Sequence, residues 1–147
     1  MKLRLGILLA GCLLVAAGFR ADKASDWKEL IGDWQPTKME LDGNALPPDD
    51  VKEFLVTMSE GKYAAKRSGE IIDEGKAVID TSKTPKQLDL TATVGDAKDK
   101  VRLGIYEIKG DTMKFVVAGV DKERPTKFES PAGSGSIYIE YKKAAKK

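Results

Sequence analysis

Two carboxylates in the middle of the chain, Asp89 and Glu107, are the side chains whose type best suits acid–base chemistry. Such a pair can serve as general acid and general base when both side chains lie in one cleft. Nothing in the sequence places these two in a common cleft, and carboxylates on strands usually face solvent. We therefore expect no hydrolase activity and assign no catalytic residue.

The composition removes several other kinds of site. The chain has no histidine, and its single cysteine is Cys12. Ser-His-Asp and Cys-His nucleophile systems are therefore impossible, and zinc sites built on His or Cys are excluded. The sequence has no calcium-binding loop of the Asp-x-Asp-x-Asp-Gly type. We expect neither a metal ion nor a cofactor.

The charge balance speaks against nucleic acid as a partner. The formal net charge is +2, and this excess is supplied by Lys2 and Arg4 at the start of the chain. The remainder is neutral, whereas binding to phosphates requires a basic excess on one face. The expected partners are a small molecule or another protein.

Residues 1–18 are typical of a secretory signal peptide, with a basic start, a short apolar run and small residues at its end. The apolar run is too short for a membrane span, which needs about 20 residues. We expect export, either to a periplasm or out of the cell, with cleavage near Gly18. Leu9-Ala10-Gly11-Cys12 also resembles a bacterial lipobox, so a membrane anchor on a lipidated Cys12 is the alternative.

Eight segments of alternating apolar and polar residues predict β-strands after a short helix at residues 24–31. We expect these strands at residues 33–41, 51–58, 62–67, 70–80, 88–94, 101–106, 113–117 and 137–141. Tight turns join most of them, which favours an all-β, eight-stranded antiparallel up-and-down barrel over a two-sheet sandwich. The barrel is one domain over residues 24–143, and residues 144–147 form a basic tail. Gly75 is expected to mark a bulge or bend.

The apolar sides of the last four strands are expected to face the barrel interior. These positions are Leu88, Leu90, Val101, Leu103, Ile105, Met113, Phe115, Val117, Ile137, Ile139 and Tyr141. An eight-stranded barrel has room for its own side chains or for one small ligand. A hollow and a filled interior are therefore both open at this point.

A series of short motifs supports the same fold through a family resemblance. The motifs are Gly32-Asp33-Trp34, Asp42-Gly43, Pro85 before Leu88-Asp89-Leu90, Gly104-Ile105-Tyr106, Gly110-Asp111, Arg124-Pro125 with Phe128, and Gly133-Ser134-Gly135. Their order and spacing resemble an uncharacterised lipocalin-like domain family found mainly in planctomycete bacteria, over residues 27–143. The resemblance implies the lipocalin fold and no particular activity.

The resemblance also bears on single residues. It implies that Trp34 closes one end of the barrel beneath a basic side chain from the end of the last strand, for which Lys142 or Lys143 is suitably placed. Members of the family often carry a cysteine in the seventh strand. This chain has Val116 there, so no thiol chemistry is expected from that strand.

The barrel mouth is expected at the end where the two longest connections, residues 42–50 and 119–135, lie together. Functional residues concentrate on such loops. In one interpretation Arg124 and Lys127 meet an anionic head group while Phe128 lines the entrance.

The alternative assigns these residues a structural role, which we favour. Arg124 then pairs with a nearby carboxylate, Asp96 or Asp99, and Phe128 pins the loop to the barrel. Tyr106 has the same two interpretations: its hydroxyl meets the ligand, or its ring packs against the N-terminal helix from outside the barrel.

Two classes of function remain. The first is an exported, non-enzymatic, lipocalin-like protein that binds a small apolar or amphiphilic ligand at the barrel mouth. The second is a filled barrel that acts as a protein-interaction or inhibitor module of the cell envelope. An apolar cavity would favour the first class, and a packed interior with an exposed apolar patch would favour the second. In the first class, Arg124→Ala should weaken ligand uptake, whereas a large loss of stability would indicate an anchor.

Overall fold

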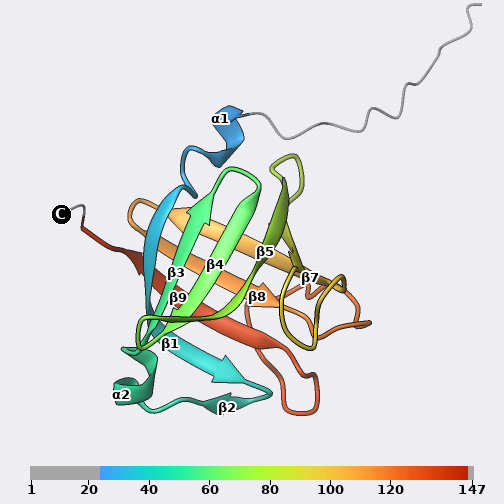
Figure 1. The fold of residues 1–147 in the computed structure, drawn as a ribbon. Helices are drawn as coiled ribbons and strands as arrows, with labels where there is room; N and C mark the ends of the chain where they lie inside the picture. Colours follow the sequence, from blue (N-terminus) through green and yellow to red (C-terminus); the bar gives the residue numbers. More distant parts are fainter. Residues whose placement is uncertain (1–23, 146–147) are drawn as a thin grey trace, which may run out of the picture.

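The computed structural model describes residues 24–145, which form a closed antiparallel barrel (Figure 1). Eight strands make its wall in the order β1-β3-β4-β5-β6-β7-β8-β9, and pairing of β9 with β1 closes it. The predicted eight-stranded up-and-down barrel is confirmed. The proposed signal peptide, Cys12 and the last two residues of the basic tail lie outside the described residues. Within residues 24–145, no helix is long and apolar enough to cross a membrane.

The elements follow one another around the barrel without a crossover. The strands are β1 Gly32–Leu41, β2 Asn44–Ala45, β3 Phe54–Ser59, β4 Lys62–Arg67, β5 Glu70–Asp80, β6 Lys86–Ala92, β7 Val101–Lys109, β8 Thr112–Val117 and β9 Ile137–Lys143, and the helices are α1 Ala24–Trp27 and α2 Pro48–Val51. The two-residue strand β2 only extends the pairing of β1 at its far end. Figure 1 shows α1 and α2 at opposite ends of the barrel.

Several strand boundaries differ from the prediction by one to three residues, and two differences change the kind of element. The N-terminal helix ends at Trp27 and continues as a turn, in which the amides of Leu30 and Ile31 donate to the Trp27 carbonyl. The helix α2 takes Val51 away from the predicted second strand, which begins at Phe54. Pro48 starts this helix at a position where proline's missing N–H has no intrahelical partner to lose.

Strand β7 faces the opposite way from the prediction. Leu88 and Leu90 of the neighbouring strand β6 point into the core. They pair with Gly104 and Arg102 of β7. The interior side of β7 therefore carries Arg102, Gly104 and Tyr106. Val101, Leu103 and Ile105 were therefore wrongly assigned to the interior. Ile105 is buried against Val116 and Tyr138 in a separate cluster. Both sides of β7 are covered near its middle, so burial does not alternate there. The hydrophobicity of its residues therefore could not show which of them face the barrel interior.

The other predicted interior positions are confirmed. They belong to the main core cluster or pack against it: Leu88, Leu90, Met113, Phe115, Val117, Ile137, Ile139 and Tyr141. The bulge was expected at Gly75, but the register shift of β5 falls at Ile72, between the pairs Ala65↔Asp73 and Lys66↔Ile71. The extra residue changes which side chains of β5 face inward.

The N-terminal segment closes one end of the barrel. Trp27, Leu30 and Trp34 are fully buried in the main core cluster. The indole Nε1 of Trp34 donates a hydrogen bond to the carbonyl of Leu30 at 2.7 Å, which links the N-terminal segment to β1. Ile31, which follows Leu30 directly, is 44% exposed.

The basic side chain over Trp34 is Lys143 rather than Lys142. Its Nζ lies 5.3 Å from the centre of the Trp34 ring, and it also reaches the carbonyl of Glu29 at 3.4 Å. Lys142 is exposed. Side chains alternate along β9, so Tyr141 and Lys143 share the inner side and Lys142 takes the outer one.

Candidate functional site

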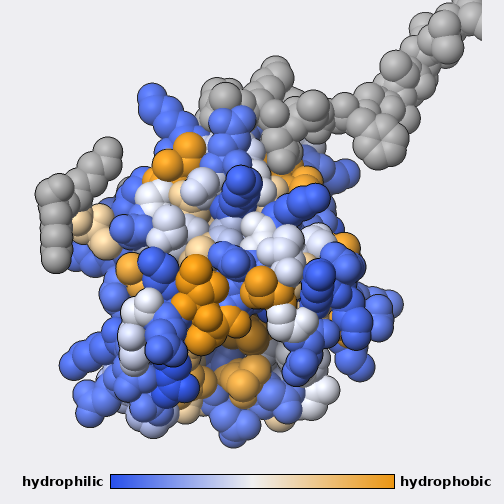
Figure 2. All heavy atoms as spheres, in the orientation of Figure 1, coloured by the Kyte–Doolittle hydropathy of each residue, from blue (hydrophilic) through white to orange (hydrophobic). Residues whose placement is uncertain are grey.

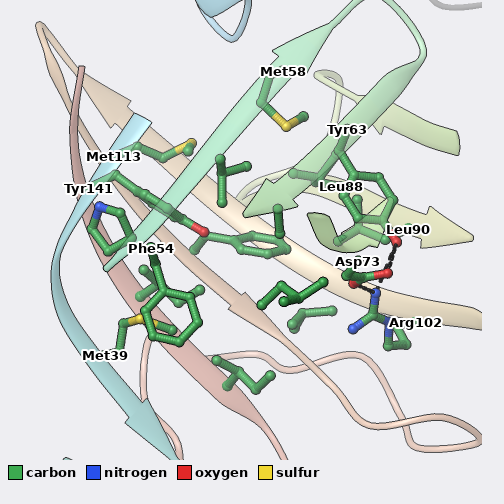
Figure 3. Close-up of a pocket in the computed structure, with 18 residues that line it drawn as sticks. Met39, Phe54, Met58, Tyr63, Asp73, Leu88, Leu90, Arg102, Met113 and Tyr141 are labelled. Carbon is green, nitrogen blue, oxygen red and sulfur yellow. Dashed lines mark hydrogen bonds and ion pairs between the residues drawn. The ribbon is translucent and has the colours of Figure 1, made fainter. Parts of the chain in front are cut away.

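The barrel interior contains a cavity of about 180 Å³, shown in Figure 3. Most of its lining is apolar and comes from strands all around the wall, including Met39, Phe54, Leu90, Phe115, Val117 and Ile139. An apolar cavity of about 150 Å³ is enough to bind benzene. The interior can therefore hold a compact molecule of about ten non-hydrogen atoms.

The cavity opens at the end of the barrel away from Trp34. Ile72 lines the cavity and is nevertheless 53% exposed. Phe54 and Ile137 also line it and are only partly buried. All three lie at or near the first residues of β5, β3 and β9, and these strands begin at the same end of the barrel. Figure 2 shows apolar side chains gathered around a hollow in the lower half of the molecule. The mouth lies at the end that the connection lengths predicted.

One charged cluster interrupts the apolar lining. The Nη2 of Arg102 donates to Asp73 Oδ2 at 2.5 Å and to the Tyr63 hydroxyl at 3.0 Å. The Tyr63 hydroxyl in turn donates to Asp73 Oδ1 at 3.0 Å, as Figure 3 shows. The side chains of Arg102 and Asp73 are 16% and 26% exposed. The two charges balance, so the cluster adds no net charge to the cavity.

Burial fixes the protonation states in this cluster. Burial raises the pKa of Tyr63 to about 12, and the negative charge of Asp73 adds to this effect. Burial acts to lower the pKa of Arg102, but the hydrogen bond to Asp73 and its charge outweigh burial and raise it. Tyr63 therefore stays a neutral phenol and Arg102 a cation at ordinary pH. The Nε of Arg102 is buried without a hydrogen-bond partner among the described residues.

Tyr141 brings a second polar group to the cavity. Its side chain is 4% exposed and lines the cavity, and Figure 3 shows the ring reaching inward from β9. Among residues 24–145 no side-chain hydrogen bond holds its hydroxyl, and this oxygen is not fully enclosed, since the fully buried side-chain atom without a partner is Arg102 Nε. Burial alone raises the pKa of Tyr141. The cavity therefore contains a neutral hydroxyl that the fold leaves without a partner.

Arg124 lies on the outer wall of the barrel and does not line the cavity. Its guanidinium holds Asp89 of β6 with two bonds, Nη1 to Oδ1 at 2.5 Å and Nη2 to Oδ2 at 3.0 Å. Nη1 also donates to the Gly104 carbonyl of β7 at 2.8 Å. The predicted partners Asp96 and Asp99 are not used. The anchoring interpretation of Arg124 matches these contacts, with a different carboxylate.

The other predicted site residues are also away from the cavity lining. Phe128 packs on the outer cluster of Ile105, Val116 and Tyr138, and Lys127 is exposed on its own loop. Tyr106 is buried in the same cluster as Trp27, inside the barrel rather than outside it. Tyr106 and Phe128 both line a surface groove that is separate from the cavity. Their positions do not match the interpretation that gathers them around a ligand entrance, and those of Arg124 and Phe128 match the structural role that we favoured.

The two carboxylates considered for acid–base chemistry do not share a cleft. Asp89 is held by Arg124, and Glu107 pairs with Lys109 at 3.0 Å on the surface. Among residues 24–145, no group of three or more acidic side chains is placed to hold a metal ion.

Sequence reasoning missed the polar residues of the cavity. The available signal was a pair of opposite charges, Asp73 and Arg102, in strands that are otherwise apolar on one side. It was hidden because the bulge at Ile72 and the covered outer side of β7 obscure which side each charge faces.

No family model, curated protein or solved structure matches this chain.

The contacts of Arg124 lead to a first prediction. Arg124→Met should lower the free energy of unfolding by about 1–3 kcal/mol, because it removes a two-point ion pair and a hydrogen bond to the Gly104 carbonyl. Chemical denaturation measures the change. Lys127→Met, which alters an exposed cation on the same loop, is the control and should change stability by less than about 0.5 kcal/mol. An unchanged stability for Arg124→Met would contradict the anchoring role.

Proposed function

We propose that this chain binds a small, largely apolar molecule inside its barrel and performs no chemistry on it. The observation that carries the proposal is the apolar cavity of about 180 Å³ that opens at one end. Burial of apolar ligand surface contributes about 25 cal/mol per Å². A compact ligand burying roughly 200 Å² thus gains about 5 kcal/mol, which corresponds to a dissociation constant on the order of 0.1–1 mM.

The N-terminal sequence supports export of this binding protein. A basic start, an apolar run and small residues in the first 18 positions suit a signal peptide. The bound molecule would then be met outside the cytoplasm, in a periplasm or beyond the cell. N-terminal sequencing of the mature protein from its host separates cleavage near Gly18 from lipidation at Cys12.

Filling the cavity tests the proposal. Val117 is buried and lines the cavity, so Val117→Phe should occupy the space and weaken binding of α-methylstyrene by at least about 10-fold. A ring placed into existing empty space should cost less than the 1–3 kcal/mol typical of overpacking. Ligand-induced chemical shifts in the protein's NMR spectrum measure the affinity.

Val78→Phe is the matched control. It makes the same substitution at a residue that is 58% exposed, so it should leave the affinity unchanged. If the two variants weaken binding equally, or if wild-type protein binds neither α-methylstyrene nor acetophenone, the interior is not the binding site.

A second candidate function is recognition of a protein at the mouth. Seven large apolar side chains of the described residues are exposed, and five of them stand where strands meet the mouth: Leu41, Ile71, Ile72, Val94 and Val101. Exposed apolar groups of this kind mark interaction sites when they form a patch. Val117→Phe separates the two candidates, because it fills the interior and leaves these five side chains in place.

A further inference from the structure

We infer that the ligand of the cavity is an uncharged molecule that accepts a hydrogen bond from Tyr141. This inference rests on the proposed function and names the ligand class for the same cavity. It predicts compact ketones, esters or ethers as ligands, and it rejects carboxylates of the same size.

The first argument is the hydroxyl of Tyr141. Tyr141 lines the cavity, and a hydrogen bond between its hydroxyl and a ligand would contribute about 0.5–1.5 kcal/mol net. The cross-strand neighbours of Tyr141 are Met113 and Pro36, which offer no strong acceptor in their side chains. Both of these neighbours also line the cavity. A ligand oxygen is therefore the group that can supply the missing acceptor.

The second argument is the charge of the cavity wall. Arg102 is the lining cation, and its charge is already balanced by Asp73 at 2.5 Å. A ligand carboxylate would lose its hydration on entering and would meet the carboxylate of Asp73 as well as the guanidinium. Uncompensated burial of an ion is costly. The wall therefore favours an uncharged ligand.

Three probes of one size and shape separate these contributions. Acetophenone carries a carbonyl oxygen, α-methylstyrene replaces that oxygen by a CH₂ group, and benzoate replaces the methyl group by a charged oxygen. All three have the same number of non-hydrogen atoms and fit the volume available. Their affinities are measured by NMR titration of wild-type protein, Tyr141→Phe and Asp73→Asn.

Tyr141→Phe removes the hydroxyl and keeps the ring. It should weaken acetophenone binding by about 3- to 10-fold, which is the effect of one net hydrogen bond. Binding of α-methylstyrene should stay within about 2-fold, and this comparison cancels the different hydrophobicity of the two probes. An equal change for both probes would overturn the role of Tyr141.

Asp73→Asn tests the preference for an uncharged ligand. The asparagine keeps an oxygen that can accept from Arg102 and Tyr63, and it leaves the positive charge of Arg102 unbalanced. Wild-type protein should bind benzoate at least about 10-fold more weakly than acetophenone, and Asp73→Asn should reverse much of this difference. Tight benzoate binding by wild-type protein would overturn the inference while leaving the proposed function standing. Failure of both neutral probes to bind would overturn the proposed function itself.

Discussion

Trp34→Ala is expected to lower the free energy of unfolding by about 3–5 kcal/mol, the range for removal of a fully buried aromatic side chain. Trp34 has no exposed surface and belongs to the main core cluster. Its indole also donates to the Leu30 carbonyl at 2.7 Å, and its ring lies under Lys143. The substitution therefore removes packing, a buried hydrogen bond and a cation–π contact at once.

Two controls separate these contributions. Trp34→Phe keeps an aromatic ring and loses the indole N–H, so it should cost less than Trp34→Ala. Ile31→Ala alters a nearby side chain that is 44% exposed and should change stability by about 0.5 kcal/mol or less. The measurement is equilibrium denaturation in urea. A loss below about 1 kcal/mol for Trp34→Ala would show that the N-terminal segment does not close the barrel in solution.

The architecture could be predicted from sequence because most strands have one buried and one exposed side. In the first half of β8, for example, buried Met113 and Phe115 alternate with exposed Lys114. Prediction failed where that condition fails. In β7 the residues Gly104, Ile105 and Tyr106 are all buried in succession, so hydrophobicity carries no information on which of them faces the core.

The candidate site was harder to predict than the fold. A cavity is the space that packing leaves unfilled, and no pattern along the chain records it. The Asp73–Arg102 pair joins β5 to β7 across the intervening β6, and the inward position of Asp73 follows a register shift at Ile72. Tyr141 was correctly placed in the interior, but the absence of a partner for its hydroxyl depends on neighbours from other strands.

The loop after β8 is another part of the structure that the sequence predicts only partly. A long loop with Arg124 and Phe128 can be expected to need anchors, and the structure provides them. The sequence could not show that the part of this loop with Arg124 and Phe128 lies on the outer wall of the barrel. Only the later part of the loop, through Ser130 and Gly135, reaches the turn at Asp42 and Gly43 at the mouth end. The course of the earlier part is why Arg124 meets Asp89 of β6 and not the nearer carboxylates of the preceding loop.

Gly75→Ala is expected to destabilise the protein by more than about 3 kcal/mol, through steric overlap between neighbouring strands. A Cβ at Gly75 would overlap the backbone carbonyl of Thr91 and would lie 2.9 Å from the Cα of Ala92. Both atoms belong to the backbone of β6, which pairs with β5 in regular register here. Neither atom can move without separating the two strands.

Gly61→Ala is the matched control for this prediction. Gly61 has a φ of +74° and nothing within 4 Å of its added Cβ, so alanine there should cost only about 1 kcal/mol of backbone strain. Thermal and urea denaturation of the two variants measure the difference. Because Gly75 also pairs with Tyr63, Gly75→Ala should disturb the Tyr63–Asp73–Arg102 cluster, which NMR can follow through the Tyr63 ring resonances. If Gly75→Ala were no more destabilising than Gly61→Ala, the close approach of β5 to β6 would be wrong, and the position of Asp73 on the cavity wall would lose its structural basis.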